Sequence, residues 1–109
     1  MTTEKTIKKQ ILVRLSELGV FAWNNPVGLA TPLKAQRPIQ FGLPGTADIL
    51  GIMPDGRGIG VETKSRTGRQ RNTQKKWQRR WERNKGLYII ARSVEQLEQA
   101  LQSAGYQTE

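Results

Sequence analysis

Two short apolar segments on either side of a turn constrain the fold of this chain more than any other feature. Residues 47–53 and 58–64 have the composition of strands, and Pro54-Asp55-Gly56-Arg57 between them predicts an antiparallel hairpin. Directly paired residues of a hairpin have numbers with a constant sum, about 110 for a loop centred on Asp55. Asp48 and Glu62 then stand opposite each other. A strict two-residue turn would shift this register by one, and a bulge at Gly56 or Gly58 would restore it.

The segments around the hairpin predict three helices and two more strands. A helix is expected over residues 4–18, a strand over 20–23, and an aperiodic loop over 24–45, which holds four of the five prolines. After the hairpin, Asn72 or Thr73 is expected to cap a helix that ends at Asn84-Lys85-Gly86. The apolar run 87–91 predicts a buried strand, and Ser93 begins a last helix.

These elements follow one another in the order helix, three strands, helix, strand, helix. Because strand, helix and strand in succession favour a right-handed parallel crossover, the sheet should be mixed, with helices flanking it. The chain is therefore expected to be a single α/β domain over residues 1–109. Trp77 and Trp81 are expected in the core, and Trp23 in the core or in a dimer interface.

The positive charge of the chain is concentrated in one segment. The net charge is +9, with 18 Lys and Arg against 9 Asp and Glu. Residues 64–85 hold ten basic side chains opposed only by Glu82, which accounts for the whole excess. Such a patch favours a polyanionic partner. A solvated helical face that serves solubility is the alternative.

Other features of the composition exclude several classes of site. The chain has no cysteine and no histidine, so disulfides, a cysteine or histidine zinc site, a thiol nucleophile and a histidine base are excluded. The sequence has no apolar run long enough to span a membrane, and its N-terminus lacks the pattern of a signal peptide. We therefore expect a cytoplasmic protein that does not bind membranes.

Asp48, Glu62 and Lys64 are the residues of the hairpin best suited to catalysis. Lys64 projects from the same face as Glu62, because it lies two residues further along the strand. Two adjacent carboxylates need a positive charge between them, and carboxylate oxygens favour Mg²⁺ or Mn²⁺. Such a site suits phosphodiester hydrolysis. A cross-strand salt bridge of Lys64 with either acid explains the same residues, and spacing alone does not decide between the two.

The spacing of these residues resembles the PD-(D/E)XK nuclease superfamily. Gly45-Thr46-Ala47-Asp48, Glu62-Thr63-Lys64 fourteen residues later, and Gln74 opening a helix are similar to its virus-type replication-repair nuclease branch (VRR-NUC), in its small stand-alone phage and bacterial form. The segment from Ala91 to Leu97 also resembles the closing strand-to-helix junction of that branch. One departure is Ala47, where the family usually has proline.

The resemblance implies a restriction-endonuclease-like core and an endonuclease that depends on Mg²⁺ or Mn²⁺. In that family pattern Asp48, Glu62 and the backbone carbonyl of Thr63 would bind metal, Lys64 would assist the attacking water, and Gln74 would support the site. The family also places a glutamate on its first helix, for which Glu4 is the candidate. The cell implied is a bacterium or a phage-infected host.

A nuclease of this kind would bind DNA mainly through phosphates. We expect structure-selective cleavage of branched DNA such as Holliday junctions, in repair or recombination, by a homodimer that supplies two active sites. A non-catalytic DNA- or RNA-binding module, including a small ribosomal-type protein, remains the alternative. The candidate DNA-binding residues are Arg66, Arg69, Arg71, Lys75, Lys76, Arg79, Arg80 and Arg83.

Overall fold

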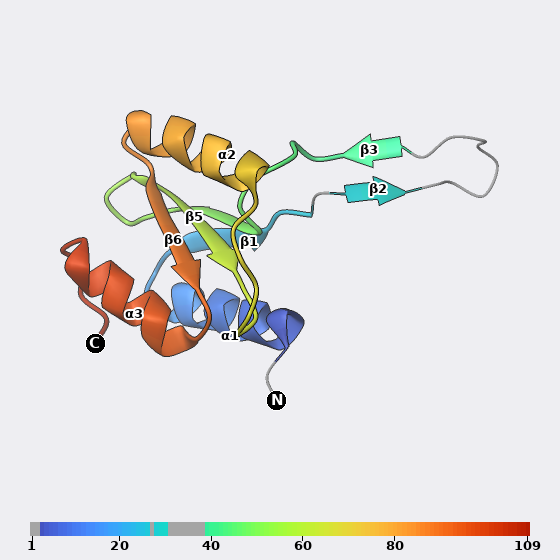
Figure 1. Cartoon of the computed structure of the whole chain (residues 1–109). Helices are drawn as coiled ribbons and strands as arrows, with labels where there is room; N and C mark the ends of the chain where they lie inside the picture. The colour runs from blue at the N-terminus through green and yellow to red at the C-terminus, as the bar shows by residue number, and fades with distance from the viewer. Residues whose placement is uncertain (1–2, 27, 31–38) are drawn as a thin grey trace.

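The predicted hairpin is the centre of a four-stranded sheet in the computed structural model, which describes residues 3–26, 28–30 and 39–109. Its strands lie in the order β1-β4-β5-β6, with β4 antiparallel to β1 and β5, and β5 parallel to β6 (Figure 1). The mixed α/β fold expected from the sequence is therefore confirmed. The strands are β1 (Phe21–Asn24), β4 (Ile49–Ile52), β5 (Gly58–Thr63) and β6 (Leu87–Ala91).

The register of the hairpin is the one that the sequence predicts. Ile49 pairs with Val61 and Ile52 with Gly58, so the residue numbers of each pair have the same sum, as expected. The turn achieves this with a third loop residue, Gly56, in the left-handed region at φ 92°. The Met53 N–H donates to the Arg57 carbonyl at 2.8 Å, which closes the loop.

Asp55 stabilises this turn and connects it to the C-terminal segment. Its Oδ1 accepts from the backbone N–H of Arg57 at 3.0 Å, and its Oδ2 accepts from the Tyr106 hydroxyl at 2.8 Å. The Arg57 N–H, followed by the Tyr106 hydroxyl, holds the pKa of Asp55 below its ordinary value. Asp55 is therefore a turn residue, as its sequence context indicates.

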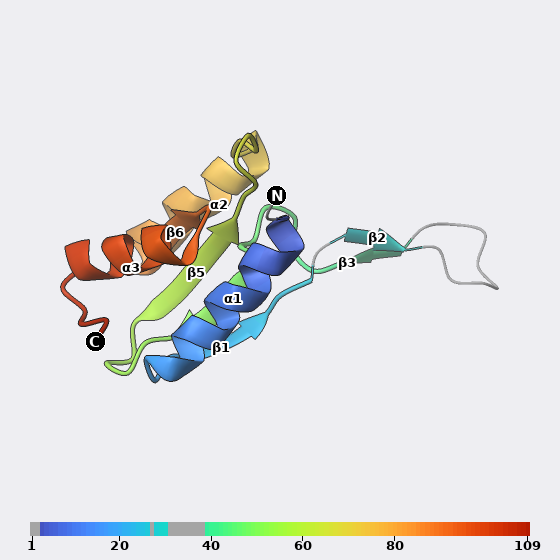
Figure 2. The same ribbon diagram turned by 90° about the horizontal axis from the view of Figure 1, so that it is seen from below.

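Helices cover both faces of the sheet. α1 (Glu4–Glu17) and α3 (Val94–Ser103) pack on one face, and α2 (Asn72–Arg83) packs on the other (Figure 2). The side chains between α1, α3 and the sheet form the main core, because the apolar positions of both helices and the odd-numbered positions of β4 and β5 point there. Its fully buried members include Ile11, Leu15, Ile49, Ile59, Val61, Leu97 and Leu101.

α2 contacts the sheet through two tryptophans that lie over glycines of β5. The rings of Trp77 and Trp81 stack with their centroids 4.7 Å apart and are half-buried. A Cβ at Gly60 would come within 3.0 Å of the Trp77 ring, and one at Gly58 within 3.0 Å of the Trp81 ring. The inner face of α2 therefore packs on the sheet, as the sequence predicts, but the two tryptophans are half-buried and lie outside the main core. Glycine at these strand positions leaves room for the rings.

The expectation of a loop throughout residues 24–45 is wrong. Within residues 24–45, expected to be a loop, β2 (Gly28–Ala30) and β3 (Ile39–Phe41) form a separate antiparallel sheet that projects away from the main one (Figure 1). Strands of three residues are too short for an alternating pattern to reveal them. Of the two positions expected for Trp23, the core is excluded, because the residue is 42% exposed on β1, an edge strand. The dimer interface stays a prediction. Among the helices in the described part of the chain, none is long and apolar enough to cross a membrane.

Candidate active site

Asp48 and Glu62 come together where β4 begins and β5 ends. Asp48 directly precedes Ile49, so the hairpin register extended by one residue places it opposite Glu62. Asp48 Oδ2 accepts from the Thr63 backbone N–H at 2.9 Å and from the Thr63 hydroxyl at 2.6 Å. These two bonds fix the orientation of the aspartate on the neighbouring strand.

The Glu62 carboxylate is almost fully buried and only partly paired. Its residue is 2% exposed, and its Oε1 lies 4.0 Å from Lys64 Nζ. Its Oε2 is buried without a hydrogen-bond partner among the described residues. Burial raises the pKa of Glu62 well above its ordinary value, and the neighbouring Asp48 carboxylate adds to this. The charges of Lys64 and Arg71 act in the opposite direction.

Lys64 is held by a glutamine of α2. The residue is 7% exposed, and its ammonium donates to Gln74 Oε1 at 3.0 Å. The same oxygen accepts from the backbone N–H of Arg71 at 2.8 Å, at the N-terminus of α2. Gln74 thus joins the lysine that directly follows β5 to the first turn of the next helix, ten residues further along the chain.

The N-terminus of α2 differs from the expectation that Asn72 or Thr73 caps it. α2 begins at Asn72 and Arg71 is its N-cap residue, whose side chain makes no capping hydrogen bond. The acceptor comes from within the first turn, because Gln74 reaches back to the Arg71 N–H. The N-terminal turn and the position of Lys64 therefore depend on one side chain.

Gly45 explains why the segment before Asp48 needs a glycine. Its φ is +86°, a region that side chains disfavour, and a Cβ there would lie 2.7 Å from the Thr73 carbonyl carbon. The loop that leads to Asp48 therefore runs against the first turn of α2. This close approach brings Asp48 and Gln74 to the same cavity, whose lining also includes Arg71, Lys8 and Asn24.

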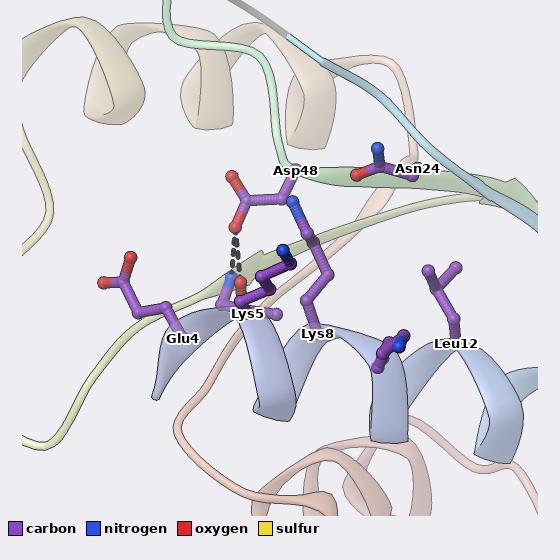
Figure 3. A pocket seen from close by; sticks show the side chains of 8 residues that line it. Glu4, Lys5, Lys8, Leu12, Asn24 and Asp48 are labelled. Carbon is purple, nitrogen blue, oxygen red and sulfur yellow. Dashed lines mark hydrogen bonds between the residues drawn. The ribbon is translucent and has the colours of Figure 1, made fainter. Parts of the chain in front are cut away.

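Glu4 lies near the carboxylate pair but is engaged elsewhere. Its Oε1 accepts from the Ser65 backbone N–H at 3.0 Å, which connects the first turn of α1 to the loop after β5. Glu4 also lines a cavity of about 530 Å³ together with Asp48 and Thr63 (Figure 3). Within residues 3–26, 28–30 and 39–109, no three acidic side chains converge as metal ligands. Glu4 as a ligand stays a prediction.

The donors at this site fit a hard divalent cation. Asp48 and Glu62 offer carboxylate oxygens, and Thr63 between them adds a backbone carbonyl, the ligand types that such ions prefer. The observation that favours a cation here is the buried Oε2 of Glu62, which has no hydrogen-bond partner in the described part of the chain. A carboxylate oxygen left in that condition costs free energy unless a cation or a proton binds it.

The predicted basic residues line the loop after Lys64 and the outer face of α2. All eight are exposed, and none forms an ion pair with an acid among the residues with described side chains. They are Arg66, Arg69, Arg71, Lys75, Lys76, Arg79, Arg80 and Arg83. Sequence reasoning missed Lys8, which lies beside Asp48 in both cavities. The available signal was its position one helical turn after Glu4, on the same face of α1.

Comparisons with known proteins support the fold. No protein-family model matches the chain, and no curated protein matches it. A solved structure described as a VRR_NUC domain superposes on it with a TM-score of 0.67 and 20% sequence identity, over 97% of this chain and 100% of that one. This chain therefore has the fold of a VRR_NUC domain. At that level of identity the similarity establishes the fold, and activity is a separate question.

Proposed function

We propose that this protein is an endonuclease that hydrolyses phosphodiester bonds of DNA and depends on Mg²⁺ or Mn²⁺, with residues 1–109 acting as one nuclease domain. The observation that carries the proposal is the buried Oε2 of Glu62, opposite Asp48 and beside Lys64, an oxygen that has no hydrogen-bond partner among the described residues. A salt bridge alone would satisfy the glutamate more fully than a 4.0 Å approach does. The VRR_NUC fold adds support, because its name denotes a nuclease domain.

Each residue of the site has a definite part in this reaction. Asp48, Glu62 and the Thr63 carbonyl would hold the metal, and Thr63 also orients Asp48 through two hydrogen bonds. When bound, a divalent cation polarises a phosphoryl oxygen and lowers the pKa of bound water. Lys64 offsets the negative charge that develops on the phosphate or orients the attacking water. Gln74 positions Lys64.

The exposed basic residues of α2 and of the loop before it would contact the DNA backbone. Phosphate contacts position a nucleic acid without reading its bases, so binding should depend on DNA structure and on salt rather than on sequence. Branched DNA such as a Holliday junction is the substrate that we propose, in repair or recombination. A non-catalytic nucleic-acid-binding module is the second candidate, since the charge alone accounts for binding.

Paired cuts at a junction require two copies of this chain, because one chain carries one set of Asp48, Glu62 and Lys64. We propose a homodimer. The edge strand β1 supports this, since it leaves Phe21 70% and Trp23 42% exposed. Sedimentation at increasing concentration should give a dimer for the wild type and a monomer for Phe21→Glu/Trp23→Glu. A monomeric wild type at all concentrations would contradict the dimer.

A cleavage panel tests the proposed activity. Purified protein is incubated with labelled junctions, forks, flaps and duplexes, in Mg²⁺, in Mn²⁺ and in EDTA. We expect metal-dependent cuts, most rapid on branched substrates, that Glu62→Ala abolishes while DNA binding in EDTA persists. If the wild type binds these DNAs and cuts none in either metal, the non-catalytic binding module is the correct function.

A further inference from the structure

Lys8 occupies a position in the site that neither the charge pattern nor the nuclease motif indicates. It lies outside residues 64–85, on the helix that covers the opposite face of the sheet from α2. Its side chain extends from α1 toward Asp48 (Figure 3). It lines both cavities at that aspartate, so it faces the candidate active site from the side opposite α2.

The ammonium of Lys8 is not committed to a carboxylate of the described residues. No ion pair joins it to Asp48 within 4.0 Å, and Asp48 Oδ2 already accepts two hydrogen bonds from Thr63. Glu4, one turn earlier on α1, is bonded to the Ser65 N–H. An ammonium has three donors, so that of Lys8 can donate to a group that enters the cavity.

The smaller cavity places Lys8 across from a second cation. This cavity, of about 320 Å³, is lined by Lys8 of α1, by Asp48, by Gln74 of α2 and by Arg71, the N-cap residue of that helix. Lys5 and Lys9 line the neighbouring cavity and extend the positive charge along α1. Cationic side chains from two elements that line a polar cavity favour an anion with several oxygens, and a phosphodiester has that chemistry.

We propose that Lys8 is a substrate-positioning residue that binds a backbone phosphate of the nucleic acid beside the scissile one, opposite Arg71. This inference rests on the proposed nuclease function and deepens it. The nucleic acid is then held from both sides of Asp48, by α1 as well as by α2. The net charge of the sequence does not reveal the lysines of α1, because acidic residues elsewhere in the chain cancel their charge in the total.

Salt-dependent binding of Lys8→Gln tests the proposal. Binding of a fluorescein-labelled duplex and a four-way junction is measured in EDTA, without divalent metal. Loss of one phosphate contact lowers the slope of log affinity against log salt by about 0.9. This change in slope corresponds to binding that is about 15-fold weaker near 50 mM salt and about 4-fold weaker near 200 mM salt, on both DNAs.

Two matched variants control for charge and for size. Gln99→Glu makes the same change in net charge on the exposed surface of α3, away from both cavities, and should leave the slope unchanged. Lys8→Arg keeps the cation and should restore the slope. Thermal melting establishes that each variant is folded. If Lys8→Gln does not fold, Lys8→Met replaces it in the binding measurements.

Three results would overturn the proposal. They are a wild-type slope for Lys8→Gln, an equal change of slope for Gln99→Glu, and wild-type DNA binding by Lys8→Gln in EDTA together with a higher Mg²⁺ requirement for cleavage. The last would make Lys8 a charge neighbour of the carboxylates rather than a phosphate ligand. A wild type that binds but never cuts would refute the nuclease function, while the binding slopes would still decide the role of Lys8.

Discussion

Replacing Gln74 by alanine removes one acceptor from two donors at once. Gln74 Oε1 accepts from the Lys64 ammonium at 3.0 Å and from the Arg71 N–H at 2.8 Å, in a residue only 3% exposed. A hydrogen bond to a buried charge contributes about 1.5–3 kcal/mol to stability. The loss of a helix N-terminal acceptor costs about 1 kcal/mol. Gln74→Ala should therefore lower the free energy of unfolding by about 2.5–4 kcal/mol.

Gln78 supplies a control one turn further along α2. Its Oε1 accepts a single neutral bond, from Gln70 Nε2 at 2.8 Å, and its side chain is half-buried. Gln78→Ala should therefore cost only about 1 kcal/mol. Urea denaturation measures both variants, and equal slopes against urea would show that the unfolded states are comparable. A loss for Gln74→Ala no larger than that for Gln78→Ala would refute the proposed double role of Gln74.

Three further predictions concern the turns and the basic face. Gly45→Ala should destabilise the fold by about 1–3 kcal/mol more than Gly56→Ala in urea denaturation. Both glycines have a positive φ, but of the two only Gly45 has backbone atoms that an added Cβ would meet. Equal losses would contradict the close approach of this loop to α2. Hydrogen bonds hold the pKa of Asp55 below its ordinary value, so its stabilising contribution is present above that value and is lost as pH falls through the folded pKa. Tyr106→Phe should therefore weaken the acid dependence of the melting temperature, and an unchanged pH profile would argue against the contact. Arg79→Glu should weaken binding to every DNA alike by gel shift, whereas a loss on one sequence only would contradict phosphate contacts.

The central hairpin was predictable because its turn chemistry is local. A glycine that tolerates positive φ, placed after Pro54-Asp55, permits a three-residue loop, and that loop fixes the register through β4 and β5. The strands β2 and β3 were not predictable, because three-residue strands in a proline-containing segment carry no periodic signal. The exposure of Trp23 could not be predicted either, since it depends on which strand forms the edge of the sheet.

Part of the candidate site could likewise be predicted from the sequence, and part of it could not. Asp48, Glu62 and Lys64 share one hairpin, so their proximity follows from strand geometry. The two hydrogen bonds that Gln74 Oε1 accepts, and the position of Lys8, depend on how α2 and α1 pack against the two faces of the sheet. No local sequence pattern encodes this packing. The same is true of Glu4, whose bond to Ser65 joins residues 61 positions apart.

Binding of Mn²⁺ by the protein without DNA tests the carboxylate site most directly, because it does not depend on knowing the substrate. Calorimetric titration of the wild type should reveal a site that Glu62→Gln and Asp48→Asn each weaken at least about tenfold, a loss of about 1.4 kcal/mol or more. Glu95→Gln, which removes an exposed carboxylate from α3, should leave it unchanged. Equal Mn²⁺ affinity in the wild type and in all three variants would contradict a metal site at Asp48 and Glu62.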